Sequence, residues 1–426
     1  MIKLLEVIRN LYKINNEITH IRKVQMDSRK VQKGDIFFAI NNGKNYIGEV
    51  LKKGVSLVIS EDKKWENNSK VLVVENVIKS LQNIAKEYRK ELPVKLIGIV
   101  GSNGKTTTKD ILYSILSIKY NTKKTEGNYN NHIGVPFTIL QINEKDNFGI
   151  IEMGMSNFGE IKKLCEIANL DYSIITNIGD SHLAFMKNRK NVFLEKSKVK
   201  DYVEESNLLF FGDDPYLKSL KGRKVGFNSY NEFRISDYNL EENGIFFKLN
   251  NEEYKSNIYG KHNCINTALS IGMSKIIGLT TQEIKKGLGK IEITPMRFQK
   301  ILKDEITFIN DSYNASPISM KYSLNTFEKF KTTKEKVVIL ADMGELGARE
   351  IDFHVEVIKY AINKDFLKVI LYGDRMEKAL QRIDDKKKII FFRKKTDIKE
   401  LISKEFKNKL ILIKGSNFNQ LWEIIE

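Results

Sequence analysis

The stretch LIGIVGSNGKTTT, residues 96–108, decides the fold of this 426-residue chain. An apolar, β-branched run enters a glycine-rich turn that ends in Gly104-Lys105-Thr106 and opens a helical pattern. Glycines let backbone N–H groups approach phosphate oxygens, and the N-terminus of the following helix adds positive potential. Lys105 is placed to reach the β- and γ-phosphates, and the Thr106 hydroxyl is placed to bind Mg²⁺. We therefore predict a nucleoside triphosphate site at this strand-to-helix turn.

The spacing differs from the common P-loop pattern G-x-x-x-x-G-K-[ST]. Ile99 stands six residues before Lys105, where that pattern has glycine, and a shorter G-x-x-G-K-T loop begins at Gly101. The alternative is a glycine-rich turn without a ligand. The strand and helix patterns on either side disfavour that alternative.

The composition is typical of a large globular protein. The length predicts two or three domains, and an apolar content of 41% is enough for packed cores. Cys165 and Cys264 are too few for a disulfide framework and show no metal-ligand spacing, which fits a reducing cytoplasm. The N-terminal residues do not resemble a signal peptide, and no apolar run is long enough to span a bilayer. We expect a cytoplasmic monomer without a membrane partner.

The net charge of +17 raises the question of a nucleic-acid partner. The lysines are spread along the chain among acidic residues, and no recognisable nucleic-acid motif is present. This pattern favours a solvated surface over a nucleic-acid groove, so we expect no nucleic-acid partner. A polyanionic small-molecule substrate also suits a basic protein.

The residue pattern predicts an α/β fold with a small N-terminal domain. Residues 1 to about 90 mix short strands and helices, with a strand at 36–40 and a helix at 78–92. From Lys95 onward strands alternate with helices, which is typical of a mostly parallel sheet. Residues 208–259 are less regular and suggest a meandering set of strands.

A further α/β domain is expected after Thr294-Pro295, because proline interrupts the helical pattern there. Three short apolar strands follow, separated by helical stretches, at 337–340, 369–372 and 410–413. The predicted domains are residues 1–92, 93–294 and 295–426.

Polar residues follow two strands of the central domain. Glu152 ends an apolar strand, where a carboxylate can hold Mg²⁺, although an acidic residue in an exposed loop is the alternative. His182 follows the next strand and is either a ligand or phosphate contact, or a structural histidine. Asn128 and Asn131 lie in an amide-rich segment that either lines a polar ligand or forms a plain turn.

Four residues further along are ambiguous on their own. Asn263 and Asn266 share one helix face, so one can cap the helix while the other reads an adenine edge. Arg297, near the domain junction, is either a surface residue or a group that stabilises charge on the γ-phosphate. Asp311 begins a turn after a strand.

Several motifs in the same order resemble the ATP-dependent Mur ligases of peptidoglycan synthesis. They are Gly101-Ser102-Asn103-Gly104-Lys105-Thr106-Thr107, Gly260-Lys261-His262-Asn263 with Asn266, and Met296-Arg297-Phe298-Gln299. The segments at 127–136, 152–161 and 310–317 resemble the member that adds a dipeptide. The resemblance runs from Asp27-Ser28-Arg29 to Lys414-Gly415-Ser416, nearly the whole chain.

The resemblance implies three domains: a small N-terminal domain for the uridine nucleotide, a central P-loop ATPase domain, and a Rossmann-like C-terminal domain for ATP and the dipeptide. It implies a ligase that joins D-alanyl-D-alanine to a UDP-N-acetylmuramoyl-tripeptide through an acyl phosphate, with ATP and Mg²⁺. The implied catalytic residues are Lys105, Lys196, His182 and Arg297. The implied metal ligands are Thr106, Glu152, His182 and Lys196, the last as the lysine that family members carbamylate.

The resemblance also assigns the remaining contacts. Nucleotide contacts are implied for Gly101, Asn103, Gly104, Lys105, Thr106, Thr107, Asn266, Arg297 and Asp311. Substrate contacts are implied for Ser28, Arg29, Asn128 and Asn131.

The chain departs from the family pattern at three places. Ala184 replaces the usual acid after His-Leu, Lys187-Asn188 replaces Gly-Ser, and Asn417 replaces an arginine. Lys198 competes with Lys196 as the modified lysine. The rival functions are another ligase of the same superfamily, such as a folylpolyglutamate synthase or the ligase that adds the third residue, and a nucleic-acid-dependent P-loop ATPase.

Overall fold

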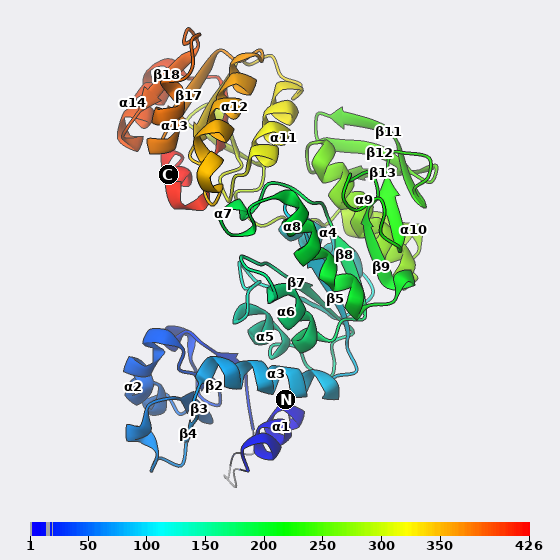
Figure 1. The fold of residues 1–426 in the computed structure, drawn as a ribbon, viewed down its shortest axis with the longest axis vertical. Coiled ribbons are helices and arrows are strands. Elements are labelled where there is room, and N and C mark those ends of the chain that lie inside the picture. Colours follow the sequence, from blue (N-terminus) through cyan, green and yellow to red (C-terminus); the bar gives the residue numbers. More distant parts are fainter. Residues whose placement is uncertain (1, 14–17, 19) are drawn as a thin grey trace.

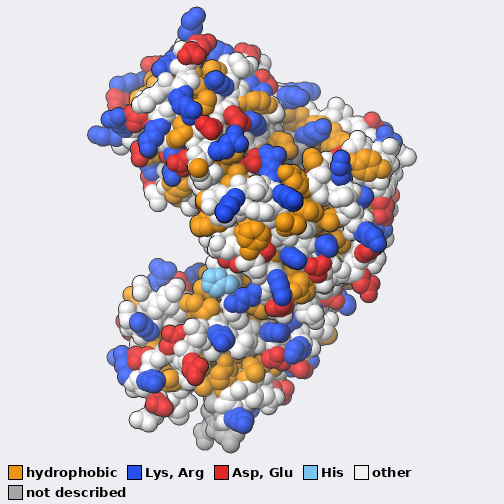
Figure 2. Space-filling view, in the orientation of Figure 1, with side chains coloured by type: hydrophobic (Ala, Val, Ile, Leu, Met, Phe, Trp, Pro, Cys, Tyr) orange, Lys and Arg blue, Asp and Glu red, His pale blue; other side chains and the backbone are white. Residues whose placement is uncertain are grey.

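The computed structural model describes residues 2–13, 18 and 20–426 as three α/β units arranged in a C shape (Figure 1). The N-terminal unit (blue) and the C-terminal unit (orange to red) lie at opposite ends of the central one. Figure 2 shows a deep notch between these two ends on the face that is viewed. Each unit contains its own sheet, so the predicted three-domain α/β fold is confirmed.

The N-terminal unit is a short parallel sheet in the order β1-β2-β3-β4. Its strands are so short that the sheet is stabilised mainly by apolar residues packed on both faces. The elements are α1 (Ile2–Tyr12), β1 (Val24–Gln25), β2 (Ile36–Phe38), α2 (Ile47–Lys52), β3 (Leu57–Ser60), β4 (Val71–Val73) and α3 (Val77–Glu91).

The central unit is a nine-stranded sheet in the order β13-β12-β11-β10-β9-β8-β5-β7-β6. Helices α4, α9 and α10 cover one face, and α3, α5 and α6 cover the other. The elements in its first half are β5 (Lys95–Val100), α4 (Lys105–Leu116), β6 (Thr122–Lys124), α5 (Gly134–Ile139), β7 (Phe148–Glu152), α6 (Glu160–Ala168), β8 (Tyr172–Ile175), α7 (Leu183–Met186) and α8 (Arg189–Lys196).

The second half of the central unit corrects one expectation. Residues 208–259 are not a simple meander, because β9 and β10 extend the parallel sheet and only β12 and β13 run antiparallel to their neighbours. The elements are β9 (Leu208–Phe211), β10 (Arg223–Gly226), β11 (Phe233–Glu241), β12 (Gly244–Leu249), β13 (Glu252–Ser256), α9 (Lys261–Ile277) and α10 (Thr281–Leu288).

The C-terminal unit is a six-stranded sheet in the order β14-β15-β19-β16-β17-β18, parallel except for β14. Buried side chains fill both faces. The elements are β14 (Gln299–Lys303), β15 (Ile306–Asn310), α11 (Pro317–Glu328), β16 (Lys336–Ala341), α12 (Glu350–Ile362), β17 (Lys368–Tyr372), α13 (Asp374–Leu380), β18 (Ile389–Phe392), α14 (Lys395–Glu405) and β19 (Leu410–Lys414). In the described part of the chain, no helix has the length and apolar character needed to cross a bilayer.

Candidate active site

The glycine-rich loop between β5 and α4 needs glycine at two positions. Gly101 has φ of 149°, and a Cβ there would lie 1.9 Å from the Thr176 hydroxyl oxygen. Gly104 has φ of 82° and precedes the first turn of α4, where a Cβ would lie 2.4 Å from the Asn266 side chain. Neither position accommodates a side chain. The backbone amides at the start of α4 are therefore free to approach an anion closely.

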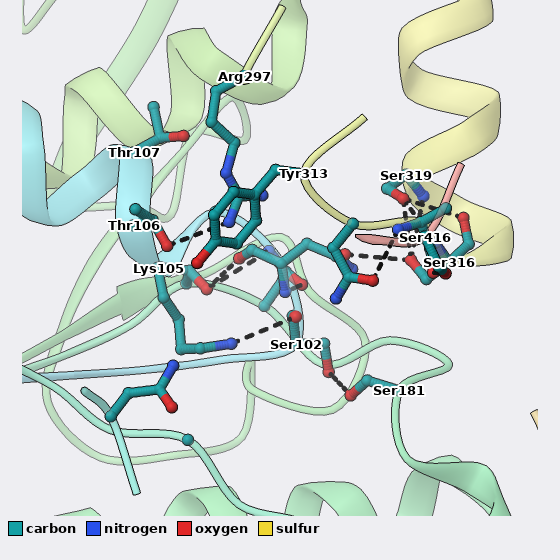
Figure 3. A pocket seen from close by; sticks show the side chains of 18 of the residues that line it. Ser102, Lys105, Thr106, Thr107, Ser181, Arg297, Tyr313, Ser316, Ser319 and Ser416 are labelled. Atoms are coloured by element: carbon teal, nitrogen blue, oxygen red, sulfur yellow. Dashed lines mark hydrogen bonds between the residues drawn. The ribbon is translucent and has the colours of Figure 1, made fainter. Parts of the chain in front are cut away.

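The loop opens into a cavity of about 790 Å³ between the central and C-terminal units. Figure 3 shows Lys105, Thr106 and Arg297 grouped on one side of this cavity, with Ser316 and Ser416 across from them. Both units contribute to the lining. The predicted residues that line it are Asn103, Gly104, Lys105, Thr106, Thr107, Asn128, Asn131, Glu152, His182, Asn266, Arg297 and Asp311.

Lys105 is folded back onto the loop, where its Nζ donates to the Gly101 carbonyl oxygen at 2.8 Å. Burial lowers the pKa of Lys105, while the negative charge of Glu152 opposes that shift. Lys105 thus lies in the loop itself and lines the cavity into which the loop opens. This is the expected place for the lysine of a triphosphate-binding loop.

Glu152 lies at the end of β7 and is 2% exposed. Its Oε1 accepts a hydrogen bond from the Asn130 amide at 2.9 Å, and its Oε2 has no hydrogen-bond partner. Lys109 Nζ lies 3.7 Å from Oε2. A buried carboxylate oxygen without a hydrogen-bond donor suits a cation, so the alternative of an exposed loop acid is wrong. Asn130 orients Glu152, a role that the asparagine-rich segment alone did not distinguish from that of its neighbours.

His182 has φ of 56° and comes just before α7. Its Nδ1 lies 2.6 Å from Glu345 of the C-terminal unit, and this contact lowers the pKa of the Glu345 carboxyl group. The backbone N–H of Ala184 also donates to the Glu345 carbonyl oxygen at 3.1 Å. Glu345 thus supplies a carboxylate where Ala184 offers none. Sequence reasoning missed it because 163 residues separate it from His182.

Lys196 and Lys198 have opposite surroundings. Lys196, at the end of α8, is fully buried, its Nζ has no hydrogen-bond partner, and burial lowers its pKa well below the ordinary value. The nearby ammonium group of Lys105 lowers the pKa further. Lys198 is half-exposed on the surface and lies near Asp201. Of the two, only Lys196 has an enclosed amine whose pKa is lowered by burial, and both properties favour modification of the neutral form.

Arg297 reaches from the C-terminal unit to the phosphate loop. Its Nη2 donates to the Thr106 hydroxyl at 3.2 Å, and its guanidinium lies 4.0 Å from the centre of the Tyr313 ring (Figure 3). Its Nε is buried without a hydrogen-bond partner. This arrangement leaves donor capacity facing the cavity. The reading of Arg297 as a plain surface residue is therefore wrong.

Asp311, directly after β15, is held by groups of its own unit. It accepts hydrogen bonds from Lys414 Nζ at 2.7 Å and from the Ser323 hydroxyl. Lys414 is fully buried, and burial lowers its pKa against the opposing effect of Asp311. These hydrogen bonds fix the Asp311 side chain, which forms part of the cavity wall.

The start of α9 forms another wall. Asn266 donates to Asn263 Oδ1 at 3.0 Å and lies against Gly104 of the loop. His262 stacks on Tyr322 of α11 with ring centres 5.6 Å apart, and burial lowers its pKa to about 4. A neutral imidazole and two amides make this wall polar but uncharged, which suits a nucleotide base.

The four predicted substrate contacts are divided between two places. Asn128 and Asn131 line the cavity, although Asn131 Oδ1 also accepts from the backbone N–H groups of Ile133 and Gly134 before α5. Ser28 and Arg29 lie in the N-terminal unit and do not line it. Arg29 pairs with Asp27 and holds the pKa of that carboxyl group at about 2.

Comparison with known proteins identifies the family. Residues 99–274 match the family described as Mur ligase middle domain, and residues 296–417 match Mur ligase, glutamate ligase domain. The UDP-N-acetylmuramoyl-tripeptide–D-alanyl-D-alanine ligase of Bacillus subtilis (strain 168) is 33% identical, over 96% of this chain and 93% of its own. The chain belongs to the Mur ligase family. Its similarity to this relative extends over nearly its full length.

Solved structures agree with this assignment. MurF from Thermotoga maritima in complex with ADP is 26% identical, with a TM-score of 0.84 over 97% of both chains. A MurF structure from Acinetobacter baumannii shares the fold, with a TM-score of 0.88 over 99% of this chain and 97% of that chain at 23% identity. This Mur ligase is therefore an ATP-dependent ligase with three α/β domains.

Proposed function

We propose that this Mur ligase joins D-alanyl-D-alanine to a UDP-N-acetylmuramoyl-tripeptide, with ATP as the energy source. The observation that carries the proposal is the cavity in which Lys105 and Glu152 of one unit meet Arg297 of another. Phosphoryl transfer needs aligned reactants and neutralised charge more than covalent help from the protein. A cavity between two units that brings Lys105 and Arg297 together supplies both.

The reaction takes two steps. A carboxylate oxygen of the tripeptide attacks the γ-phosphorus of ATP, which forms an acyl phosphate and releases ADP. The amine of D-alanyl-D-alanine then attacks the acyl carbon, inorganic phosphate leaves, and the nitrogen loses a proton. Lys105 and Arg297 stabilise the charge that develops on the transferred phosphoryl group. The buried surroundings strengthen both interactions.

Mg²⁺ fits the residues on this side of the cavity. Within the described residues no three His, Cys, Asp or Glu side chains are grouped to hold a metal ion. Mg²⁺ usually takes only one or two protein ligands together with phosphates and water, so Glu152 Oε2, which accepts no hydrogen bond, and the Thr106 hydroxyl suffice. His182 belongs to the proposed set as well. When bound, the ion neutralises phosphate charge.

Lys196 is the proposed site of carbamylation. The neutral form of its amine reacts with carbon dioxide to form a carbamate and releases one proton, so a buried neutral amine becomes an anion. The support is the buried Nζ without a hydrogen-bond partner and the lowered pKa. Glu195 holds this end of α8 in place, because its carboxylate accepts from Gly159 N and Ile161 N at 3.0 and 2.9 Å.

The remaining assignments place the substrates around the cavity. Asn266 and Asp311 contact the nucleotide, Asn128 and Asn131 contact the tripeptide, and Ser28 and Arg29 hold the uridine nucleotide across the notch. Domain boundaries near 92 and 294 are part of the same proposal. We also propose a cytoplasmic monomer, a location supported by two cysteines that are both buried and free.

One assay tests the function. Phosphate release is measured with a UDP-N-acetylmuramoyl-tripeptide and ATP, with D-alanyl-D-alanine, glutamate or a diamino acid as the acceptor. Release that depends on D-alanyl-D-alanine supports the proposal. Release that depends on another acceptor, or on DNA or RNA, contradicts it.

A further inference from the structure

Helix α4 carries two buried charged residues that the proposed reaction does not use. Lys109 and Asp110 follow the phosphate loop by one turn, and each is about 1% exposed. Lys109 Nζ lies 3.7 Å from Asp110 Oδ1, and Lys124 Nζ donates to the same oxygen at 2.7 Å. A buried carboxylate is retained at this depth only when cations and hydrogen-bond donors surround it.

The other oxygen of Asp110 binds a segment far along the chain. Oδ2 accepts from the Thr294 backbone N–H at 3.0 Å and from the Thr294 hydroxyl at 2.7 Å. Thr294 precedes Pro295 at the start of the linker that leads into the C-terminal unit. Asp110 therefore fastens this linker to the helix that holds the phosphate loop.

The linker is strained immediately after this attachment. Met296 has φ of 63° and Phe298 has φ of 55°, so left-handed residues stand on both sides of Arg297. Such conformations are unfavourable for residues with a side chain and persist only where the surroundings hold them. On the far side, the Phe298 N–H donates to Asp311 at 3.2 Å. On the N-terminal side of Arg297, the two hydrogen bonds from Thr294 to Asp110 hold the linker in the same way.

We propose that Asp110, through Thr294, is a positioning residue for Arg297. The two bonds fix the start of the strained linker, so that the guanidinium is presented to the phosphate loop beside Thr106. Lys109 and Lys124 neutralise Asp110 and allow it to remain a buried hydrogen-bond acceptor. The proposal rests on the proposed contact between Arg297 and the γ-phosphate.

Thr294→Val tests this role with little change in shape. The variant removes the hydroxyl bond and keeps the backbone bond, while Thr294→Ser restores the hydroxyl. Binding of a non-hydrolysable ATP analogue and of ADP is measured by calorimetry. We expect Thr294→Val to weaken binding of the analogue about tenfold and of ADP less than about twofold, because ADP lacks the γ-phosphate. Thr294→Ser should bind both like the native chain.

A double-mutant cycle shows whether the effect passes through Arg297. In an Arg297→Ala background, Thr294→Val should not weaken analogue binding further. Thr281→Val is the matched control, because it also removes a hydroxyl-to-carboxylate bond (2.9 Å to Glu252) but lies on α10 away from the cavity. It should bind both nucleotides normally. Thermal unfolding midpoints identify any variant with a general folding defect.

Three results would overturn the proposal: unchanged analogue binding by Thr294→Val, equal weakening of analogue and ADP, or a full additional loss in the Arg297→Ala background. The proposed function fails separately, if the native chain releases no phosphate in response to D-alanyl-D-alanine. In that case the nucleotide-binding measurements still decide the role of Asp110.

Discussion

The two junctions of the central unit are built differently. At the N-terminal junction, α3 packs on α5 and α6, and one continuous apolar cluster runs from Leu4 to Leu217. The junction is sealed by Arg89, which donates to the carbonyl oxygens of Ala168 and Asn169 and to Asp171. At the C-terminal junction polar contacts surround the cavity: Arg297 with Thr106, Ser316 with Asn103, and His182 with Glu345. Ring contacts accompany them, such as Tyr259 with Phe298.

The two junctions contribute differently: the N-terminal one mainly to stability, and the C-terminal one to the proposed chemistry. Apolar burial makes the N-terminal junction part of the protein core, and opening it would expose that surface to water. The polar junction gains little from each contact, since a hydrogen bond contributes about 1 kcal/mol net and a half-exposed ion pair such as His182 with Glu345 about 1 kcal/mol or less. Such an interface can open and close around a nucleotide. The proposed reacting groups lie at this junction.

The largest effect is expected at the polar junction. Lys105→Ala should reduce ligation by about 10³-fold or more, because it removes a cation from the phosphate-transfer site. It should leave the circular dichroism spectrum and the unfolding midpoint close to native. The matched control is Lys119→Ala, just beyond the other end of α4, which should retain full activity. Ligation at the native rate by Lys105→Ala would contradict the assignment of the site.

At the apolar junction we expect a loss of stability. Arg89→Met should lower the free energy of unfolding by about 3 kcal/mol, because Asp171 and buried carbonyl oxygens lose their partner. Urea denaturation measures the change. Arg223→Met breaks the half-exposed pair with Glu232 and should cost less than about 1 kcal/mol. Similar losses of unfolding free energy for both variants would mean that Arg89 stabilises the protein no more than a half-exposed surface pair does.

Acid should weaken the polar junction through His262. Its pKa is lowered to about 4 in the folded chain and is about 6.5 when unfolded, so between these values the unfolded state binds more protons. Stability is therefore complete above pH 6.5 and falls as the pH drops toward 4, by about 2 kcal/mol at pH 5.

Urea denaturation of the native chain and of His262→Gln at pH 7.5 and pH 5 checks this dependence. On going from pH 7.5 to pH 5, the free energy of unfolding should fall by about 2 kcal/mol less in the variant than in the native chain. An equal loss in both would assign the acid sensitivity to other groups.

The smallest effect is expected for the contact between His182 and Glu345. Glu345→Gln keeps the size of a half-exposed side chain and removes only its charge. We expect kcat/KM to fall by no more than about fivefold, since such pairs contribute about 1 kcal/mol or less. A fall of about a hundredfold would show that Glu345 does more than join the two units.

The local pattern was enough to predict much of the fold. The strand-to-helix turn at Lys105 and the strand ending at Glu152 lie as expected, because apolar runs and glycine placement act over a few residues. The route of residues 208–259 was not predictable, since β9 and β10 join the parallel sheet through contacts with β8 that no local pattern records. The pairing of His182 with Glu345 was hidden for the same reason.

By itself, the sequence determined a phosphate-binding loop, the family to which the chain belongs, and a set of polar residues at strand ends. Loop glycines and strand periodicity are short-range requirements, so they are visible in the order of residues. Only the tertiary structure decided that Lys196 is buried while Lys198 is exposed, and that Asp110 holds Thr294. Burial and long-range hydrogen bonds depend on which distant segments pack together, and that is settled only when the whole chain folds.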